Sequence, residues 1–598
     1  MLGTTFHHNR DLSVTLTIRF SVLRMICLLV GLSPLYGISE YLIGEELRIA
    51  IVQRSIAPQL AANREAMIQA IDQAAGGGAR VVVFPEGSLS GNSVTSAELL
   101  EARRDLAQAA RRRAVYLIYG EIDLDQQTKN ARQALTVIDP HGQQIYHYVK
   151  HYDQPTANLP GTFLIDGIPC AGIICADRWL RTVEELPIQR GARISFELSA
   201  NYSQEWVGEL GWYWYVPRAI RNGCWVVFAN SAENANTPGH GHSALIAPDG
   251  TLVASFPDNR QAILWAGIDL DEPTGEAAAA RLRHPVVGRF WKAGLELYQG
   301  RKLLTTSDFS TYTTTRRGVV LGAASAVLSE QQIERVVTQA ARRGVQLLAL
   351  PTLASRDHIA QLQRLAREHR LAIASAATLT SASHTTTDSE VFLIGSEGDF
   401  LVRRPLMSQV DRWTFEPSLD KIVFVLDGVP GILLAGEEIQ WAEVIELAAV
   451  AGAQLLVHVD DPQPAHDRQS VRLQQQAVAA SYGMFSVFAG ATGATIWEDL
   501  NSRQERRAVI NGMFSPRRDD LEIYSPFSAN LIARVRPTET LIVARRELAP
   551  TNGYFQDRVA RFPELASWLR WGAAELFPGM VSRATKSGRE KKSGREKQ

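Results

Sequence analysis

Residues 80–87 read Arg-Val-Val-Val-Phe-Pro-Glu-Gly, and this stretch indicates the fold class. Its β-branched apolar run is typical of a strand buried on both faces, and Pro-Glu-Gly ends the strand. A helix pattern precedes it over about 63–75, with Asn63 as the expected cap. Three glycines at 76–78 separate this helix from the strand. Because phosphate-binding glycine loops precede a helix and these glycines follow one, we interpret them as a helix stop.

Helix and strand patterns alternate on both sides of this stretch. Apolar strands that alternate with helices are typical of α/β proteins, in which helices cover the faces of mixed sheets. We therefore expect an α/β fold. In the first half, strands are expected at about 47–53, 80–84, 115–119, 134–138, 145–149, 171–174, 194–198, 225–229, 244–247 and 252–256.

The composition excludes several classes of protein. The 598 residues include 62 Lys or Arg and 63 Asp or Glu, a formal net charge of −1, which gives no electrostatic reason to expect a nucleic acid partner. Hydrophobic residues are 45% and charged residues 21%, as in folded domains. Four cysteines are too few for a disulfide scaffold, and no Cys/His pattern has zinc spacing. We therefore expect no zinc site, and the thiol chemistry considered below needs no metal and no cofactor.

Three reactive side chains come just after apolar strands: Glu86, Lys150 and Cys175. Each alone would most often be structural, but active sites of α/β proteins lie at such strand ends. A thiol needs a base to become a nucleophile, and a carboxylate can accept its proton. An ammonium group can stabilise the oxyanion of a tetrahedral intermediate. The three residues together are therefore suited to acyl transfer through a thioester.

The residues around these positions form ordered motifs: Val83-Phe84-Pro85-Glu86-Gly87, Tyr148-Val149-Lys150 and Gly172-Ile173-Ile174-Cys175-Ala176-Asp177-Arg178-Trp179. With them, residues 47–271 resemble the nitrilase superfamily of carbon–nitrogen hydrolases. The resemblance implies a four-layer αββα sandwich. It also implies that Cys175 is the nucleophile, Glu86 the general base and acid, and Lys150 the oxyanion stabiliser, with the N–H of Ala176 as a second oxyanion donor.

Some positions depart from the pattern of that family. Many members carry a second glutamate in the loop after the lysine, but residues 151–160 contain none, and Asp153 and Asn158 are the nearest polar candidates. Arg181 stands where a proline is usual, and Arg221 stands where a glutamate is usual.

The substrate pocket is expected beside the nucleophile. Asn201, Tyr202 and Trp206 follow the strand over 194–198, which neighbours the strand that carries Cys175. We therefore expect these three residues to line the pocket. For the other aromatic residues of this region, packing in the core is the favoured interpretation.

The second half of the chain resembles the first. Residues 63–86 align with 329–352 without a gap, and five residues recur in the second segment: Gln339, Ala340, Ala341, Gly344 and Pro351. A repeat of this length predicts a duplicated domain. We therefore expect the αββα sandwich twice in the chain, and we expect the second copy to pack on the first.

The second copy lacks the reactive residues. Thr352 stands in place of Glu86, Arg403 or Arg404 in place of Lys150, and Ala435 or Gly436 in place of Cys175. No cysteine follows Cys224, which excludes thiol catalysis there.

We expect four segments along the chain. They are an N-terminal extension at 1–46, a catalytic domain at 47–300, a degenerate domain at 316–545, and a C-terminal extension at 546–598 with a basic, disordered tail. Basic residues precede an apolar run in the first segment, so residues 20–43 are a candidate membrane anchor or signal. The alternatives are a packed extension or a true start at Met25, and a cytoplasmic location is favoured.

The sequence thus predicts a thiol-dependent hydrolase of non-peptide C–N bonds, acting on a linear amide, carbamoyl compound or nitrile. One alternative is an N-acyltransferase that uses the same three residues. Another is the ammonia-supplying domain of an amidotransferase, which would need an ATP-binding Ser-Gly-Gly loop that residues 316–545 do not contain. A catalytically silent scaffold or binding protein is the last alternative.

Overall fold

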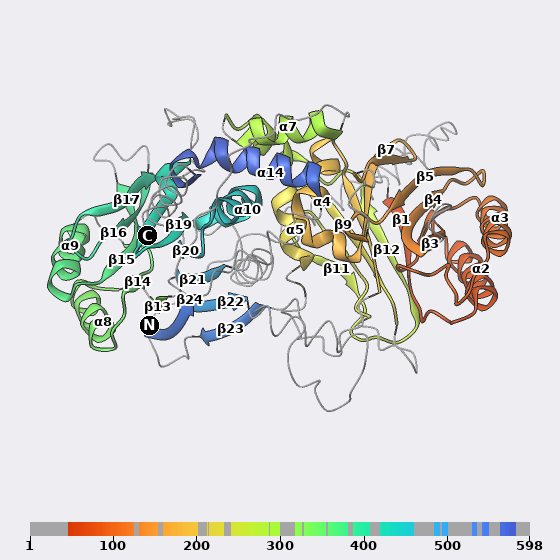
Figure 1. Ribbon diagram of the computed structural model, residues 1–598. Helices are drawn as coiled ribbons and strands as arrows, with labels where there is room; N and C mark the ends of the chain where they lie inside the picture. Colours follow the sequence, from red (N-terminus) through yellow and green to blue (C-terminus); the bar gives the residue numbers. More distant parts are fainter. Residues whose placement is uncertain are drawn as a thin grey trace, which may run out of the picture. The chain divides into compact units, whose positions relative to one another are not determined.

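Figure 1 shows the computed structural model of the chain. The chain divides into a small unit, residues 1–47 and 267–272, and a main unit, residues 48–266 and 273–598. Of the small unit, the structure describes residues 46–47 and 267–272, which are the ends of two strands and the turn that follows one of them. The structure describes residues 46–124, 131–153, 159–200, 212, 214–232, 241–285, 287–298, 317–325, 328–353, 357–380, 387–406, 419–459, 484–490, 493–499, 529–534, 541–548 and 562–581.

The first half of the chain forms two six-stranded sheets. The strands are β1 (Glu46–Gln53), β2 (Val81–Val83), β3 (Tyr116–Leu124), β4 (Ala131–Ile138), β5 (Gln144–Val149), β6 (Thr162–Ile165), β7 (Ile168–Ile174), β8 (Ile194–Ser199), β9 (Trp225–Asn230), β10 (Ala244–Ile246), β11 (Leu252–Ser255) and β12 (Ala262–Asp269). The first sheet has the order β12-β1-β2-β3-β4-β5, and the second has the order β11-β10-β9-β8-β7-β6. The strands expected from the sequence are all present, with ends that differ by a few residues.

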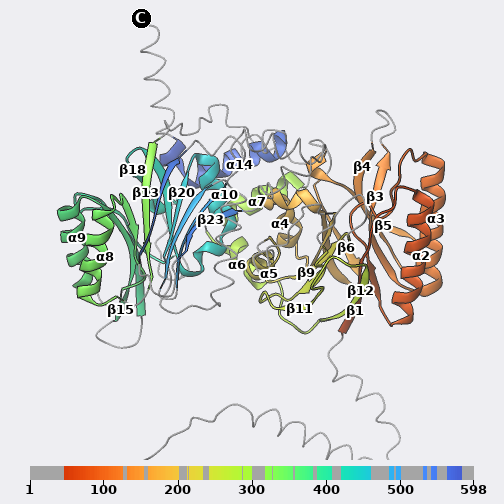
Figure 2. The ribbon, with the colours of Figure 1, turned by 90° about the horizontal axis from the view of Figure 1, so that it is seen from below.

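Helices cover the outer faces of the two sheets, as Figure 2 shows. Helices α2 (Leu60–Gly76) and α3 (Ser96–Arg113) pack on the first sheet through one apolar cluster. Helices α4 (Arg181–Gln189) and α5 (Val216–Asn222) lie on the second sheet. Between the sheets, a Cβ on Gly172 of β7 would lie 2.7 Å from a methyl carbon of Leu135 on β4, so the sheets face each other closely. This is the expected αββα sandwich.

Helix α2 begins earlier than its sequence pattern indicated. It starts at Leu60 after Gln59, so Asn63 lies inside the helix and is not its cap. The fully buried Asn63 side chain instead bonds the backbone of Ala57, with its oxygen 2.8 Å from the N–H and its nitrogen 2.7 Å from the carbonyl, and it donates to the Ser90 carbonyl at 2.8 Å. A side-chain amide offers both a donor and an acceptor, which allows it to join two loops.

The second half forms two further six-stranded sheets. The strands are β13 (Arg317–Ala324), β14 (Leu347–Ala349), β15 (Ala372–Thr380), β16 (Thr387–Ile394), β17 (Phe400–Pro405), β18 (Val423–Leu426), β19 (Val429–Ala435), β20 (Leu455–Val459), β21 (Phe485–Gly490), β22 (Gly493–Asp499), β23 (Ala529–Arg534) and β24 (Leu541–Leu548). Their strand orders are β24-β13-β14-β15-β16-β17 and β23-β22-β21-β20-β19-β18. Strand by strand, they correspond to the orders of the two sheets in the first half. This agreement supports the duplication, which stays a prediction.

One apolar cluster contains helices from both halves. It includes α4, α7 (Val287–Tyr298), α10 (Ala442–Ala451) and α14 (Pro563–Leu576). The fully buried Trp568 of α14 stacks on Phe290 of α7, with ring centroids 4.5 Å apart, and donates its indole N–H to the Phe290 carbonyl at 3.0 Å. A Cβ on Gly294 would lie 2.1 Å from the Trp568 ring, so this glycine allows the two helices to approach.

Both ends of the chain and the expected boundary between the two domains are outside the described residues. This applies to the candidate anchor at 20–43, to the boundary near 300–316 and to the basic tail. Within the described part of the chain, none of the helices has both the length and the apolar composition needed to span a membrane.

We expect Trp568→Ala to lower the free energy of unfolding by about 3–5 kcal/mol, because it removes a fully buried ring and leaves a cavity. The measurement is a urea titration followed by circular dichroism. Trp265→Ala is the matched control, because Trp265 is 46% exposed and its loss should cost less than about 1 kcal/mol. Equal losses for both variants would contradict the structural role of the α7–α14 contact.

Candidate active site

Glu86 is buried just past the end of β2, and both of its carboxylate oxygens are engaged. Oε1 accepts a hydrogen bond from the Lys150 Nζ at 2.8 Å, and Oε2 accepts one from the Ala200 backbone N–H at 3.2 Å. A Cβ on Gly120 of β3 would lie 2.5 Å from the Glu86 Cα and 2.6 Å from the Pro85 carbonyl oxygen. The absence of a side chain at Gly120 therefore allows the Glu86 segment to lie against β3.

Lys150 directly follows β5, and its backbone N–H donates to the carbonyl of Gln133 on β4 at 2.8 Å. This pairing holds the lysine backbone at the sheet edge while its side chain reaches Glu86. Both side chains of the ion pair are about nine-tenths buried. Removal of one partner from a buried pair leaves an uncompensated charge, so each residue fixes the other.

Cys175 lies at a sharp turn between β7 and the 3₁₀ helix η3 (Cys175–Trp179). Its φ is 44°, in the left-handed region that non-glycine residues seldom adopt. Such a conformation costs about 1–3 kcal/mol and is held by surrounding contacts. Here Asp177 supplies them, because its carboxylate accepts from the Ile174 N–H at 3.1 Å, from the Tyr148 hydroxyl at 2.9 Å and from the Tyr152 N–H at 2.8 Å. Tyr148 lies on β5, two residues before Lys150, so its hydrogen bond to Asp177 connects the turn with the segment that carries the lysine.

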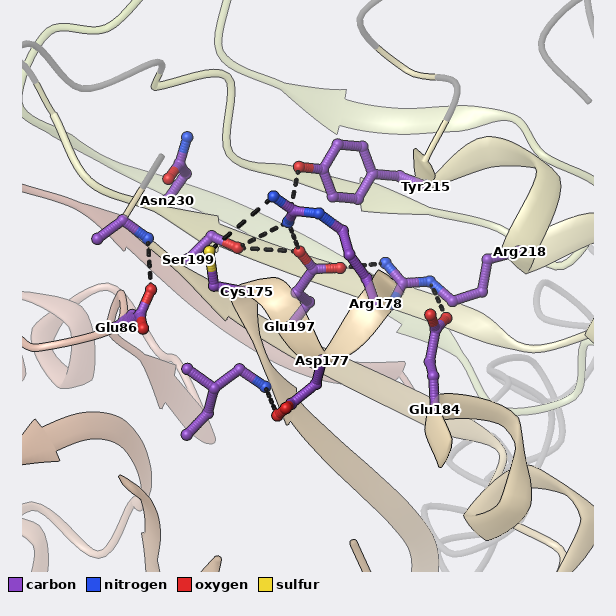
Figure 3. A network of polar contacts seen from close by, with 12 residues as sticks. Glu86, Cys175, Asp177, Arg178, Glu184, Glu197, Ser199, Tyr215, Arg218 and Asn230 are labelled. Carbon is purple, nitrogen blue, oxygen red and sulfur yellow. Dashed lines mark hydrogen bonds and ion pairs between the residues drawn. The ribbon is translucent and has the colours of Figure 1, made fainter. Parts of the chain in front are cut away.

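A buried arginine lies beside the thiol, as Figure 3 shows. One Nη of Arg178 is 4.0 Å from the Cys175 sulfur. The other forms an ion pair with Glu197 of β8 and donates to the Ser199 hydroxyl at 3.1 Å. Glu197 also accepts from Arg218 at 2.5 Å. The carboxylate is therefore shared by two guanidinium groups, and Arg178 is fixed with one edge toward the sulfur.

The surroundings of Cys175 determine its protonation state. Burial is the largest influence on the thiol and raises its pKa, the Glu86 carboxylate also raises it, and the charges of Arg178 and Lys150 lower it. Together these effects raise the pKa of Cys175 to about 11. Burial also raises the pKa of Glu197, but Arg178 and Arg218 outweigh it, so that this pKa lies below its ordinary value. At neutral pH the free thiol is protonated and Glu197 is charged.

The structure places the residues expected from the sequence as follows. Glu86 and Lys150 are in direct contact, and the charges of both act on Cys175. Ala176 is buried and follows Cys175 at the start of η3. The three pocket candidates, Asn201, Tyr202 and Trp206, lie outside the described residues, as does Asn158.

Sequence reasoning missed several residues of the site. Gly120 leaves room for the backbone of Glu86, and the backbone N–H of Ala200 donates to the Glu86 carboxylate. No sequence pattern indicates either contact. Arg178 and Glu197 did leave a signal, because Glu197 interrupts the apolar strand Ile-Ser-Phe-Glu-Leu-Ser with a charge. Of the departures from the family pattern, Arg221 forms a buried ion pair with Glu185.

Strand register identifies the corresponding positions in the second half. Leu406 follows β17 and donates its N–H to the Ser389 carbonyl at 3.3 Å, as Lys150 does to Gln133. The position of Lys150 is thus taken by Leu406, and the expectation of Arg403 or Arg404 was wrong. Of the two residues expected in place of Cys175, Ala435 and Gly436, the backbone favours Gly436. It is the first residue of the 3₁₀ helix η7 (Gly436–Gln440) and has a φ of 53°.

Among the described residues, no group of three or more His, Cys, Asp or Glu side chains could hold a metal ion.

The comparisons with known proteins concern the first half. Residues 48–275 match the carbon-nitrogen hydrolase family, and no curated protein matches the chain. The chain is similar to a solved double mutant of the amidase from Nesterenkonia sp. AN1 in complex with acrylamide, at 18% identity and a TM-score of 0.36, covering 41% of this chain and 97% of that chain. A crystal structure of an amidase from Nesterenkonia sp. gives 19% identity and a TM-score of 0.37, covering 42% of this chain and 98% of that chain.

The family match includes the segments that carry Glu86, Lys150 and Cys175 and confirms the resemblance read from the three motifs. The αββα sandwich of the same region is the fold that this resemblance implied. Residues 48–275 of this chain form a domain of the carbon–nitrogen hydrolase family, in the nitrilase superfamily.

Proposed function

We propose that this protein hydrolyses a linear amide through a thioester on Cys175, with Glu86 and Lys150 as its catalytic partners. One observation carries the proposal. A buried carboxylate–ammonium pair acts on a thiol that is presented at a strained turn. Strained backbone of this kind clusters at active sites, and the acid–base pair supplies what acyl transfer needs.

The first half-reaction forms the thioester. Because the thiol is protonated at neutral pH, Glu86 accepts its proton as the sulfur attacks the carbonyl carbon. The carbonyl oxygen becomes an oxyanion, and the Lys150 ammonium and the Ala176 N–H donate to it. Glu86 then returns the proton to the amide nitrogen, the C–N bond breaks and ammonia leaves.

The second half-reaction restores the enzyme. Glu86 takes a proton from water, and the resulting hydroxide attacks the thioester carbon. The C–S bond breaks, a carboxylic acid forms, and the proton returns to the sulfur. The hydrogen bonds of Glu86 to Lys150 and Ala200 keep the same carboxylate in position for both steps.

We expect Cys175→Ala to abolish hydrolysis, because no other atom of the site can form the thioester. The measurement is amide hydrolysis together with mass detection of an acyl adduct on the intact protein. Cys224→Ala is the matched control, because Cys224 is a fully buried thiol and should leave the activity within about twofold. Hydrolysis that survives in the Cys175→Ala protein would contradict the proposal, and product analysis with an added amine separates hydrolysis from acyl transfer.

The rate at which iodoacetamide alkylates Cys175 should rise about tenfold per pH unit from pH 7 and level off only near pH 11. The reason is that the thiolate reacts, and the pKa of this thiol is raised to about 11. Cys170 and Cys224 should react more slowly, since both are buried and burial raises their pKa values further. Peptide mapping by mass spectrometry gives the rate for each thiol. A plateau below pH 8 would indicate a preformed thiolate and remove the need for Glu86 as base.

Gly120→Ala should lower kcat/KM at least tenfold, because the new methyl group would overlap the backbone of Glu86 and displace its carboxylate. Gly76→Ala is the matched control, since a Cβ there meets nothing within 4 Å. Steady-state kinetics and thermal unfolding are measured for both variants. A Gly120→Ala protein that unfolds at the temperature of the parent and keeps full activity would show that this glycine does not position Glu86.

A further inference from the structure

A cavity of about 330 Å³ adjoins the Glu86–Lys150 pair, and the mechanism above does not use it. It is lined by residues 56–58 and 90–92 and by Ile122, Gln133, Ser231 and Ala232. Its volume lies in the range of small-molecule pockets.

Two polar atoms of this cavity have no partner in the described part of the structure. They are the side-chain oxygen of Gln133 and the hydroxyl of Ser231, and both atoms are buried. Ser231 is only 2% exposed. A buried polar group without a hydrogen bond costs about 1–3 kcal/mol, so two such groups on residues that line one cavity are candidates for hydrogen bonds to a ligand.

Three contacts connect the cavity to the catalytic residues. The Gln133 oxygen would lie 3.7 Å from a Cβ on Gly87, the residue after Glu86. Gln133 also lies directly opposite Lys150 in the β4–β5 register, so their side chains share one face of the sheet. On the other sheet, the Ser231 N–H donates to the Ser199 carbonyl at 3.2 Å, and the next residue, Ala200, holds Glu86.

The walls of the cavity are fixed before a ligand binds. The buried Asn63 amide bonds the backbone of Ala57 and Ser90, which lie in two of its walls. The nearby Arg54 is directed at Asn63, donating to its backbone carbonyl at 3.1 Å and to its Oδ1 at 3.2 Å. None of the described lining residues carries a charge, whereas Asn92, Gln133 and the serines among them offer hydrogen bonds.

The geometry points to this cavity as the site for the acyl chain of the substrate, and to an uncharged chain that carries a hydroxyl or amide group as its ligand. The carboxamide of Gln133 and the hydroxyl of Ser231 hydrogen-bond that group, and the described lining residues include no charged partner for a carboxylate or an ammonium. The inference rests on the proposed function, because it assigns the acyl side of the same reaction.

The test compares substrates of similar size: 4-hydroxybutyramide, valeramide, 4-aminobutyramide and succinamate. For the full-length protein, kcat/KM for 4-hydroxybutyramide should exceed that for valeramide at least about fivefold and that for the charged amides at least about tenfold. Ser231→Ala and Gln133→Leu should each move the ratio of kcat/KM for 4-hydroxybutyramide to kcat/KM for valeramide toward one. Ser195→Ala is the matched control, because Ser195 is also a buried serine with no hydroxyl partner among the described residues but lies outside the cavity.

The same comparison is made without turnover by calorimetric binding to the Cys175→Ala protein. Tighter binding of 4-hydroxybutyramide, weakened by Ser231→Ala, supports the cavity even if no thioester is ever detected. The assignment would be overturned if valeramide bound as tightly as 4-hydroxybutyramide or more tightly. It would also be overturned if Ser195→Ala changed the ratio of the two substrates as much as Ser231→Ala does. Hydrolysis by the Cys175→Ala protein would instead refute the proposed function, so the two failures are distinguishable.

Discussion

The buried ion pair between Glu86 and Lys150 is the interaction on which the site depends. It joins the end of β2 to the end of β5 within one sheet, and Ala200, which follows β8 of the other sheet, completes the coordination of the carboxylate. Loss of one partner from a buried pair costs about 3–5 kcal/mol, so the pair holds the ends of β2 and β5 in one arrangement. Gly120 matters because a side chain there would overlap the backbone of Glu86, and the cavity matters because Gln133, one of its lining residues, lies next to the pair.

The thiol is controlled by charges that come from both sheets. Glu86 and Lys150 belong to the first sheet, whereas Arg178 and Glu197 come from the second sheet and the turn that follows it. Because opposite charges are paired around the sulfur, no single group makes it a thiolate in the resting enzyme. In the mechanism proposed above, the thiolate would accordingly form as the proton moves to Glu86.

The second half shows which features belong to the fold and which to the chemistry. Gly436 keeps the left-handed turn, and Glu438 accepts from the Ala435 N–H at 2.9 Å, as Asp177 does from Ile174. The reactive positions are nevertheless neutral, with Leu406 where Lys150 stands in the first half. The left-handed turn after the strand is thus common to both halves, and the halves differ in the side chain that it presents. The two halves also share buried charges, since Arg281 lies 3.2 Å from both Glu185 and Glu443.

The sequence by itself determined the α/β alternation and the family of the first half, and it predicted three reactive residues, because these depend on local patterns and on motifs of a few residues. Only the tertiary structure decided how they are held. The close approach at Gly120, the Ala200 N–H, the Arg178–Glu197 pair and the inward position of Asn63 depend on contacts between residues distant in the chain. A helical period could not show that Asn63 faces two loops, and a run of strand residues could not show that Gln133 and Ser231 face one cavity. Such positions follow from how sheets stack, which sequence spacing does not encode.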